Sequence, residues 1–509
     1  MKPRLIASAR IVWPAILLLA AGLRAAEVVR RPLQVNEGLE LYLGGLRVPA
    51  LLAFMRDHNV HPPLNPLFVW ALESAHVSDA LIRALFVLIA TACALLLMFV
   101  VRRWSGEPAA SIAGFFAACM PVLIFNDTII RMYATFDLFA LLSFYCLSVL
   151  LTDDRLRAPA RRALWVVWWL TIAIALYLIY LAFFVLLAQL AYAAIVRRDA
   201  LAKASIGAGA ALAAWLPQLS TFLAQLPRGG EAFPGFAGGV PTLIATLPEQ
   251  ASLQIPYGGA FGIALVAVVW LWLIGALIAT VRRRSDSLLP WVALPALITV
   301  AYSLAAHKLL YVDRYYLLFA YALCAWTGVA LAGKSLVGRP DAVRAPASGR
   351  AVTIAAVACA LILAAAVQHV TDPKHSTAEL YGVGTLLREA SAPHDLFVFE
   401  QGTPAYVLAR LGVLQGHPLV LIFTPAEVRG AWRNIAGRDR VWYVGFEAWP
   451  IDRDALVLTQ LQTRDRLIRY WRFSRALAAE EVLVAEFERK GANAARARTR
   501  RQGEEVRPH

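Results

Sequence analysis

The sequence predicts a polytopic α-helical membrane protein with a small α/β domain at its C-terminal end. Of the 509 residues, 60% are hydrophobic and only 16% are charged, whereas soluble domains carry roughly a quarter charged residues. The hydrophobic residues gather in about eleven runs, each near the length of about 20 residues that a helix needs to cross a bilayer. These observations exclude a disordered chain, a collagen-like chain and an ordinary cytosolic protein.

The apolar runs place each expected membrane-spanning helix. We expect these helices near residues 8–26, 80–101, 108–125, 135–151, 163–179, 180–196, 201–218, 258–281, 287–305, 315–333 and 351–368. The fifth and sixth share one stretch that is too long for a single helix, so we place a turn between Tyr177 and Tyr180. The first run follows a basic start, as in a signal peptide, but residues 25–26 lack a convincing cleavage site, which favours a first span.

The formal net charge of +15 is a signal of topology. The N-terminus and alternate connections hold 19 basic and 6 acidic residues, while the opposite connections hold 10 basic and 11 acidic residues. Basic residues concentrate in cytoplasmic loops, so we place the first set in the cytoplasm. We therefore expect a bacterial inner-membrane protein with a cytoplasmic N-terminus and a periplasmic or extracellular C-terminal domain. The same distribution gives no support to nucleic-acid binding.

Composition also divides the chain into a membrane module at residues 1–368, an extracytoplasmic α/β domain at 369–489 and a disordered tail at 490–509. Two long outer loops are expected inside the module, at 27–79 and 219–257. In the C-terminal domain, short apolar runs that predict strands alternate with longer helix-like stretches. The expected strands are 395–400, 418–423 and 440–446, and the helix-like stretches are 378–390 and 454–471.

Polar residues gather where the expected helices meet the outer face. These candidates are Asn36, Glu37, His61, Arg131, Tyr133, Lys308, Arg314 and Tyr315. Ionisable residues at membrane depth are costly and are candidates for function. A carboxylate can act as a general base on a hydroxyl group, and arginine and lysine bind phosphate. The combination suits a reaction in which a lipid phosphate is the leaving group.

Each candidate also has a structural interpretation. Glu37 can be a solvated loop acid, and His61 can be a turn residue that bonds the backbone before two prolines. Arg131 can be an interfacial anchor. Arg314 and Tyr315 can belong to the basic and aromatic belt of a membrane protein. No single residue decides between these interpretations.

The order of the motifs resembles the GT-C membrane glycosyltransferases. The pattern is most similar to bacterial members of the protein O-mannosyltransferase and lipid A aminoarabinose transferase superfamily. Those proteins carry an acidic motif, a His-Pro-Pro-Leu-like element, an Arg-x-Tyr element and a distant Arg-Tyr element in this order. The matching residues here are Asn36-Glu37, His61-Pro62-Pro63-Leu64, Arg131-Met132-Tyr133 and Arg314-Tyr315. The resemblance covers roughly residues 10–370.

The resemblance implies a GT-C fold and a transferase that moves a sugar from a polyprenyl-phosphate donor to a glycan, lipid or protein acceptor, with inversion. Asn36 stands where the family commonly has its catalytic aspartate, and an amide cannot act as a base. Glu37 then takes that role, unless this branch uses a different acceptor or has reduced activity. The resemblance assigns the donor phosphate to Arg131, Lys308 and Arg314, and further substrate contacts to His61, Tyr133 and Tyr315.

No cofactor is required by this scheme. The outer loops hold no clustered DxD motif, and all five cysteines lie in apolar runs without metal-ligand spacing, so we expect no metal.

Two other functions compete with the transferase. A transporter or flippase of a lipid-linked sugar would carry charges at mid-span and paired broken helices, and the expected spans are nearly free of charge at their centres. A membrane-anchored scaffold would not need eleven spans.

Overall fold

The computed structural model describes residues 2–226, 260–282, 317–332, 349–371, 380–400, 402–422, 425–446, 455–475 and 478–490. The chain forms two compact units. The helical unit consists of Met1–Arg31 and Leu43–His375, and the C-terminal unit consists of Pro32–Tyr42 and Ser376–His509. The C-terminal unit is therefore discontinuous along the chain, because it includes a short segment from near the N-terminus. Most of the expected tail at 490–509 lies outside the described residues.

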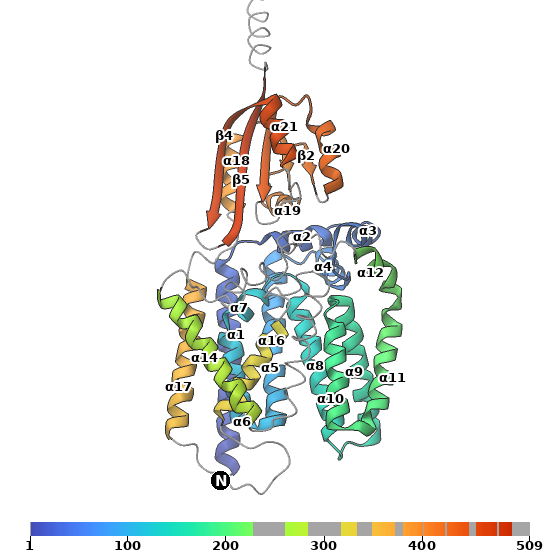
Figure 1. The fold of residues 1–509 in the computed structure, drawn as a ribbon, viewed down its shortest axis with the longest axis vertical. Coiled ribbons are helices and arrows are strands. Elements are labelled where there is room, and N and C mark those ends of the chain that lie inside the picture. The colour runs from blue at the N-terminus through green and yellow to red at the C-terminus, as the bar shows by residue number, and fades with distance from the viewer. Residues whose placement is uncertain are drawn as a thin grey trace, which may run out of the picture. The chain divides into compact units, whose positions relative to one another are not determined.

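The described part of the helical unit is built almost entirely from α-helices, many of which run side by side in a bundle (Figure 1). They are α1 (Lys2–Arg30), α3 (Val48–His58), α4 (Leu64–Ser74), α5 (Asp79–Ser105), α6 (Glu107–Cys119), α7 (Pro121–Asn126), α8 (Met132–Thr152), α9 (Ala158–Leu178), α10 (Ala182–Val196), α11 (Arg198–Trp215), the 3₁₀ helix η1 (Leu216–Gln218), α12 (Leu219–Gln225), α14 (Ala260–Arg282), α16 (Leu317–Leu331) and α17 (Gly349–Thr371).

Six helical segments among the described residues are long and apolar enough to cross a membrane. They cover Ile11–Arg30, Asp79–Ser105, Met132–Thr152, Ala158–Leu178, Arg198–Gln225 and Thr353–Thr371. Shorter apolar helices cover Ala182–Val196 and Leu317–Leu331. Helices overlie most of every expected span except 287–305, which lies outside the described residues. The total of eleven spans stays a prediction.

Two breaks interrupt the bundle helices. The turn expected between Tyr177 and Tyr180 is present, because α9 ends at Leu178 and Ile179 adopts an extended conformation with φ −153° and ψ 139°. The expected single helix at 108–125 is wrong, because the chain breaks at Met120 into α6 and α7. Pro121 explains this second break, since a proline disfavours helical geometry in the residue before it.

The expected outer loop at 27–79 is mostly helical. After α1 the chain forms α2 (Val35–Gly44), α3 and α4. Proline starts the later helices at positions where its missing N–H costs little. Pro49 lies in the first turn of α3, and Pro63 caps α4. The helix α4 thus follows directly after Pro62 and Pro63.

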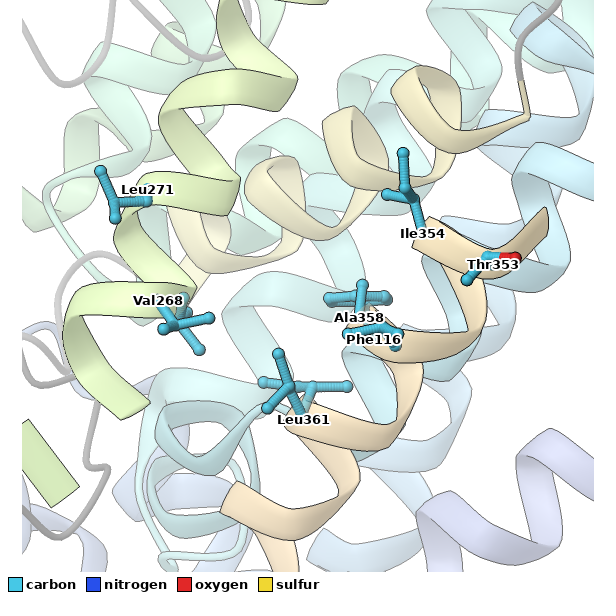
Figure 2. Close-up of a pocket in the computed structure, with 10 residues that line it drawn as sticks. Phe116, Val268, Leu271, Thr353, Ile354, Ala358 and Leu361 are labelled. Carbon is cyan, nitrogen blue, oxygen red and sulfur yellow. The ribbon is translucent and has the colours of Figure 1, made fainter. Parts of the chain in front are cut away.

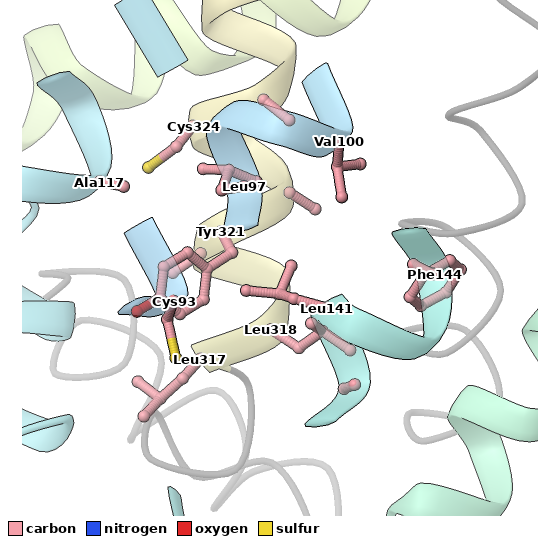
Figure 3. Packing of buried hydrophobic residues seen from close by; sticks show 14 of the residues in the cluster. Cys93, Leu97, Val100, Ala117, Leu141, Phe144, Leu317, Leu318, Tyr321 and Cys324 are labelled. Atoms are coloured by element: carbon pink, nitrogen blue, oxygen red, sulfur yellow. The ribbon is translucent and has the colours of Figure 1, made fainter. Parts of the chain in front are cut away.

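The core of the helical unit packs α5, α8 and α16 closely together. Figure 3 shows Cys93 and Leu97 of α5, Leu141 of α8, and Tyr321 and Cys324 of α16 within one buried cluster. Small residues bring α16 against α6. A Cβ atom added at Gly328 would collide with the carbonyl oxygen of Ala109 and lie 2.8 Å from the Cβ of Ala113.

The C-terminal unit contains a five-stranded sheet among its described residues. The strands are β1 (Leu396–Phe399), β2 (Leu419–Leu421), β3 (Arg440–Phe446), β4 (Asp465–Arg475) and β5 (Ala478–Arg489). Their order is β2-β1-β3-β5-β4, with β1 parallel to β2 and β3, and β5 antiparallel to β3 and β4. The helices are α18 (Leu380–Ala390), α19 (Thr403–Arg410), α20 (Pro425–Ile435), α21 (Leu456–Arg464) and most of α2.

The three expected strands and the expected helix at 378–390 coincide with β1, β2, β3 and α18. The helix-like stretch at 454–471 is wrong in its second half, because α21 ends at Arg464 and β4 begins at Asp465. Strand pairing explains the change. Tyr470 and Trp471 are residue types that favour strands, and they pair with Ala485 and Val484 of β5.

Replacement of Gly328 by alanine tests the close packing of α16 against α6. We expect Gly328→Ala to lower stability by about 1–3 kcal/mol, the typical cost of overpacking a core. Gly275→Ala in α14 is the matched control, because a Cβ atom at Gly275 meets nothing within 4 Å. Thermal unfolding of the purified protein in detergent measures both variants. Equal unfolding midpoints would contradict the packing described above.

Candidate functional site

A buried arginine lies at the break between α6 and α7. Arg24 of α1 has a side chain with no exposed surface, and its guanidinium donates to the carbonyl oxygens of Ala117 at 3.1 Å and Ala118 at 3.3 Å. These carbonyls belong to the last turn of α6, where a helix leaves its carbonyl groups without intrahelical partners. Arg24 therefore completes the hydrogen bonding of an interrupted helix.

The charge of Arg24 is balanced by Asp127, which follows α7. The two side chains approach to 3.5 Å, and both are fully buried. The hydroxyl of Tyr321 on α16 also donates to Asp127, at 2.5 Å. Burial raises the pKa of the Asp127 carboxyl, while Arg24 and Tyr321 oppose that shift by stabilising the carboxylate. This cluster ties α1, the α7–α8 connection and α16 together.

A second arginine holds the same connection from the end of α1. Arg31 donates to the carbonyl oxygens of Phe125 at 3.5 Å and Thr128 at 3.3 Å, and its guanidinium lies 5.4 Å from the centroid of the Phe125 ring. Arg31 also lies 3.8 Å from Glu27, which in turn lies 3.7 Å from His369 of α17. Arg24 and Arg31 thus both hold the segment 125–128.

Asp137 is a buried carboxyl group inside α8. Its residue is 1% exposed, and neither oxygen has a hydrogen-bond partner among the residues that the structure describes. It interacts electrostatically with Asp127. A buried polar group without a partner is costly, and such a group at membrane depth is a candidate for function. Asp137 therefore adds a second carboxyl to the candidate site.

Arg131 and Tyr133 lie at the start of α8, directly after the segment that Arg24 and Arg31 hold. Arg131 is the N-cap residue, with φ −148° and ψ 168°, and is 6% exposed. Tyr133 lies in the first helical turn and is 2% exposed. The polar cluster therefore fixes the backbone on which both of these candidate residues stand.

The backbone at His61 is fixed on both sides. Asn59 accepts hydrogen bonds from the backbone N–H groups of Val60 and His61 through its side-chain oxygen. The carbonyl oxygen of His61 accepts from the Gln225 side chain at 3.1 Å. Gln225 itself accepts from the Tyr180 hydroxyl at 2.6 Å. These contacts tie the His-Pro-Pro element to α12 and to the turn between α9 and α10.

Asn36 and Glu37 lie in α2, in the C-terminal unit. Glu37 is fully buried, and its carboxylate accepts the backbone N–H of Gln34 at 3.0 Å. This bond is half of a capping box, in which the third helical residue reaches back to the residue before the helix. One oxygen of Glu37 therefore has a structural role, which was not predicted. Asn36 is half-buried.

Lys308, Arg314 and Tyr315 lie outside the described residues. Sequence reasoning also missed four residues of the helical unit, namely Arg24, Asp127, Asp137 and Tyr321. Arg24 and Asp137 fall inside the expected spans 8–26 and 135–151, so a charge within an apolar run was the available signal. In the described parts of the chain, no group of three or more His, Cys, Asp or Glu side chains is placed to hold a metal ion.

An apolar groove of about 440 Å³ runs between α6, α14 and α17 (Figure 2). Phe116 comes from α6, Val268 and Leu271 from α14, and Thr353, Ile354, Val357, Ala358, Leu361 and Ile362 from α17. The groove is close to the polar cluster along the chain, because Phe116 directly precedes Ala117, whose carbonyl Arg24 binds.

Solved structures that are similar to this chain include ArnT and an archaeal oligosaccharyltransferase. ArnT from Cupriavidus metallidurans, bound to undecaprenyl phosphate, has a TM-score of 0.51 and 15% identity over 94% of this chain and 97% of its own. The Archaeoglobus fulgidus oligosaccharyltransferase tethered with an acceptor peptide has a TM-score of 0.52 and 13% identity over 84% of this chain and 68% of its own. The AglB oligosaccharyltransferase from A. fulgidus, in complex with an inhibitory peptide and a dolichol-phosphate, has a TM-score of 0.50 and 12% identity. The match covers 92% of this chain and 74% of the AglB chain.

The chain therefore shares its fold with ArnT and the oligosaccharyltransferase, in agreement with the resemblance that the motif order suggested. Neither the models of protein families nor the curated proteins contain a match to its sequence.

Removal of one partner from the Arg24–Asp127 pair tests the polar cluster. We expect Arg24→Ala to destabilise the protein by about 3–5 kcal/mol, because it leaves a buried carboxylate without its counter-charge. The double variant Arg24→Ala/Asp127→Ala should lose less than the sum of the two single variants, since the residues are in contact. Thermal unfolding in detergent measures the cycle, and strictly additive losses would show that the pair does not interact.

Proposed function

We propose that the protein is a glycosyltransferase that moves a sugar from a polyprenyl-phosphate donor to a cell-envelope acceptor at the outer face of the cytoplasmic membrane. The observation that carries this proposal is the GT-C fold, which matches ArnT bound to undecaprenyl phosphate over nearly the whole of both chains. The order of the sequence motifs within that fold supports it independently.

The helical unit also suits an amphipathic donor. The apolar groove between α6, α14 and α17 offers a surface for a polyprenyl chain, and the lining residue Phe116 adjoins the segment that Arg24 binds. A lipid tail gains free energy from apolar contact, while a phosphate needs cations and hydrogen-bond donors. Arg131, Lys308 and Arg314 are the cations that we assign to the phosphate.

The reaction that we propose is a single displacement. The acceptor hydroxyl loses its proton to a carboxylate, and its oxygen forms a bond to the anomeric carbon of the sugar. The bond between that carbon and the phosphate oxygen breaks, so the lipid phosphate leaves with the electron pair. Attack from the face opposite the leaving group inverts the anomeric centre. The assigned cations stabilise the charge that develops on the phosphate.

Two carboxyl groups compete for the role of base. Glu37 matches the acidic motif of the family, and Asn36 beside it can orient a hydroxyl through its amide but cannot accept a proton as a base. Asp137 is buried beside Asp127 in the helical unit. We assign the base to Glu37, with His61, Tyr133 and Tyr315 as further substrate contacts. Asp137 is the alternative base.

Conservative variants of the two carboxyl groups separate these assignments. We expect Glu37→Gln to slow sugar transfer by about 10²-fold or more, since a positioned general base contributes about 10²–10⁴. Asp137→Asn is the paired variant. The measurement is release of undecaprenyl phosphate from synthetic undecaprenyl-phosphate hexoses and pentoses, with an envelope extract supplying acceptors. If Glu37→Gln transfers sugar at the parental rate and Asp137→Asn transfers it much more slowly, Asp137 is the general base instead of Glu37.

The same assay tests the class of function. Donor binding and movement across the bilayer without release of undecaprenyl phosphate would favour a transporter or flippase over a transferase. A variant with transfer lost but membrane insertion and thermal stability retained supports the transferase.

Replacement of Arg131 tests the phosphate assignment. We expect Arg131→Ala to weaken binding of undecaprenyl phosphate by about tenfold or more, because a hydrogen bond to a charged group contributes about 1.5–3 kcal/mol. Arg131→Lys should retain part of the affinity, since lysine keeps the charge but not the bidentate geometry. A calorimetric titration in detergent measures both variants. Parental affinity in Arg131→Ala would remove this residue from the donor site.

A further inference from the structure

A segment of the first outer loop packs with the far end of the chain. Residues Pro32–Tyr42 form one compact unit with Ser376–His509, although α1 before them and α3 after them belong to the helical unit. This segment includes most of α2 and carries the acidic motif Asn36-Glu37. The position of that motif is therefore coupled to the fold of the C-terminal unit.

A glycine allows α2 to approach α19 closely. A Cβ atom added at Gly38 would lie 2.5 Å from the Cγ2 atom of Val407 and 2.9 Å from its backbone nitrogen. Contacts this short require a shift, and the backbone nitrogen cannot move aside as a flexible side chain can. Gly38 therefore lets two helices touch at a point where any other residue would separate them.

A pair of stacked tyrosines makes a second contact one helical turn away. The rings of Tyr42 on α2 and Tyr406 on α19 have centroids 3.9 Å apart and planes inclined by 17°. Burial raises the pKa of the Tyr406 hydroxyl above its usual value. Residues four apart lie on the same face of a helix, so Gly38 and Tyr42 together present one face of α2 to α19.

These contacts leave Glu37 little freedom. It directly precedes Gly38 in the helix, at about 100° around the helix axis, and its carboxylate is bonded to the backbone of Gln34. The side chain is thus restrained by its own helix, and the helix is restrained by the C-terminal unit. Misplacement of a reacting group by about 1 Å can cost about 10²-fold in rate.

We propose that the C-terminal unit is a positioning module for α2. It holds the Asn36-Glu37 motif in the orientation that the reaction needs, and it does so through the packing of Gly38 and Tyr42 against Val407 and Tyr406. This inference rests on the proposed function for the assignment of Glu37 as the base. The packing of α2 on α19 stands independently of that assignment, and it can be measured separately.

Alanine at Gly38 is the direct test in the full-length protein. We expect Gly38→Ala to raise the hydrogen-exchange rates of amides in residues 35–44 by about tenfold or more, because the contact that closes α2 onto α19 is lost. We expect kcat for sugar transfer to fall by about 10- to 100-fold, with the affinity for undecaprenyl phosphate unchanged. Gly430→Ala in α20 is the matched control, since a Cβ atom there meets nothing within 4 Å.

The tyrosine pair supplies a second test if Gly38→Ala does not fold. We expect Tyr406→Ala to raise amide exchange in α2 and to lower kcat, and we expect Tyr406→Phe to restore both, because phenylalanine keeps the ring stack. If these residues only stabilised the fold, the variants would lower the yield of folded protein. They would not lower kcat while leaving the affinity for undecaprenyl phosphate unchanged.

The outcomes separate the inference from the function on which it rests. Faster exchange in α2 with reduced kcat supports the positioning module. Unchanged exchange in α2 in both Gly38→Ala and Tyr406→Ala overturns it, whatever the transfer assay shows. Faster exchange in α2 with unchanged kcat also overturns it, provided that Glu37→Gln slows transfer by about 10²-fold or more. If Glu37→Gln transfers sugar normally, the assignment of the base has failed, and the inference is overturned with it even though the packing remains.

Discussion

The polar cluster of the helical unit follows from one broken helix. Pro121 ends α6, and the carbonyl groups at that end then need donors in an apolar interior that offers no water. Arg24 supplies the donors, but a buried cation needs a counter-charge. Asp127 provides it and is in turn bonded by Tyr321. One proline thus accounts for a chain of partners that joins three helices and orders the residues before α8.

The sequence was sufficient for most of the long apolar helices and for three strands because their signals are local. An apolar run of adequate length predicts a helix, and alternating short runs predict the strands β1 to β3. Long-range pairing carries no local signal. Arg24 and Asp127 are about a hundred residues apart, so neither identifies the other in the sequence. The same reason explains the wrong helix over β4, whose conformation depends on β5.

The candidate site, like the fold, could be predicted from the sequence only in part. Motif order drew attention to His61 and Arg131, and the structure shows firm backbone support for both. It also gives Glu37 a capping bond that the motif did not suggest. Residue type alone could not separate a catalytic carboxylate from a structural one, because both roles use the same oxygens. Asp137 was missed although it falls inside the expected span 135–151, because only the structure shows that its carboxyl group is buried without a hydrogen-bond partner among the described residues.

The discontinuous C-terminal unit also has a consequence for biosynthesis. Residues 32–42 leave the ribosome early, but Tyr406 and Val407, on which they pack, follow more than 360 residues later. At about 5–20 residues per second, synthesis of the intervening chain takes roughly 20–70 s. During that interval α19, on which α2 packs, has not yet been synthesised. The acidic motif therefore reaches its final packing only after about four-fifths of the chain has been made.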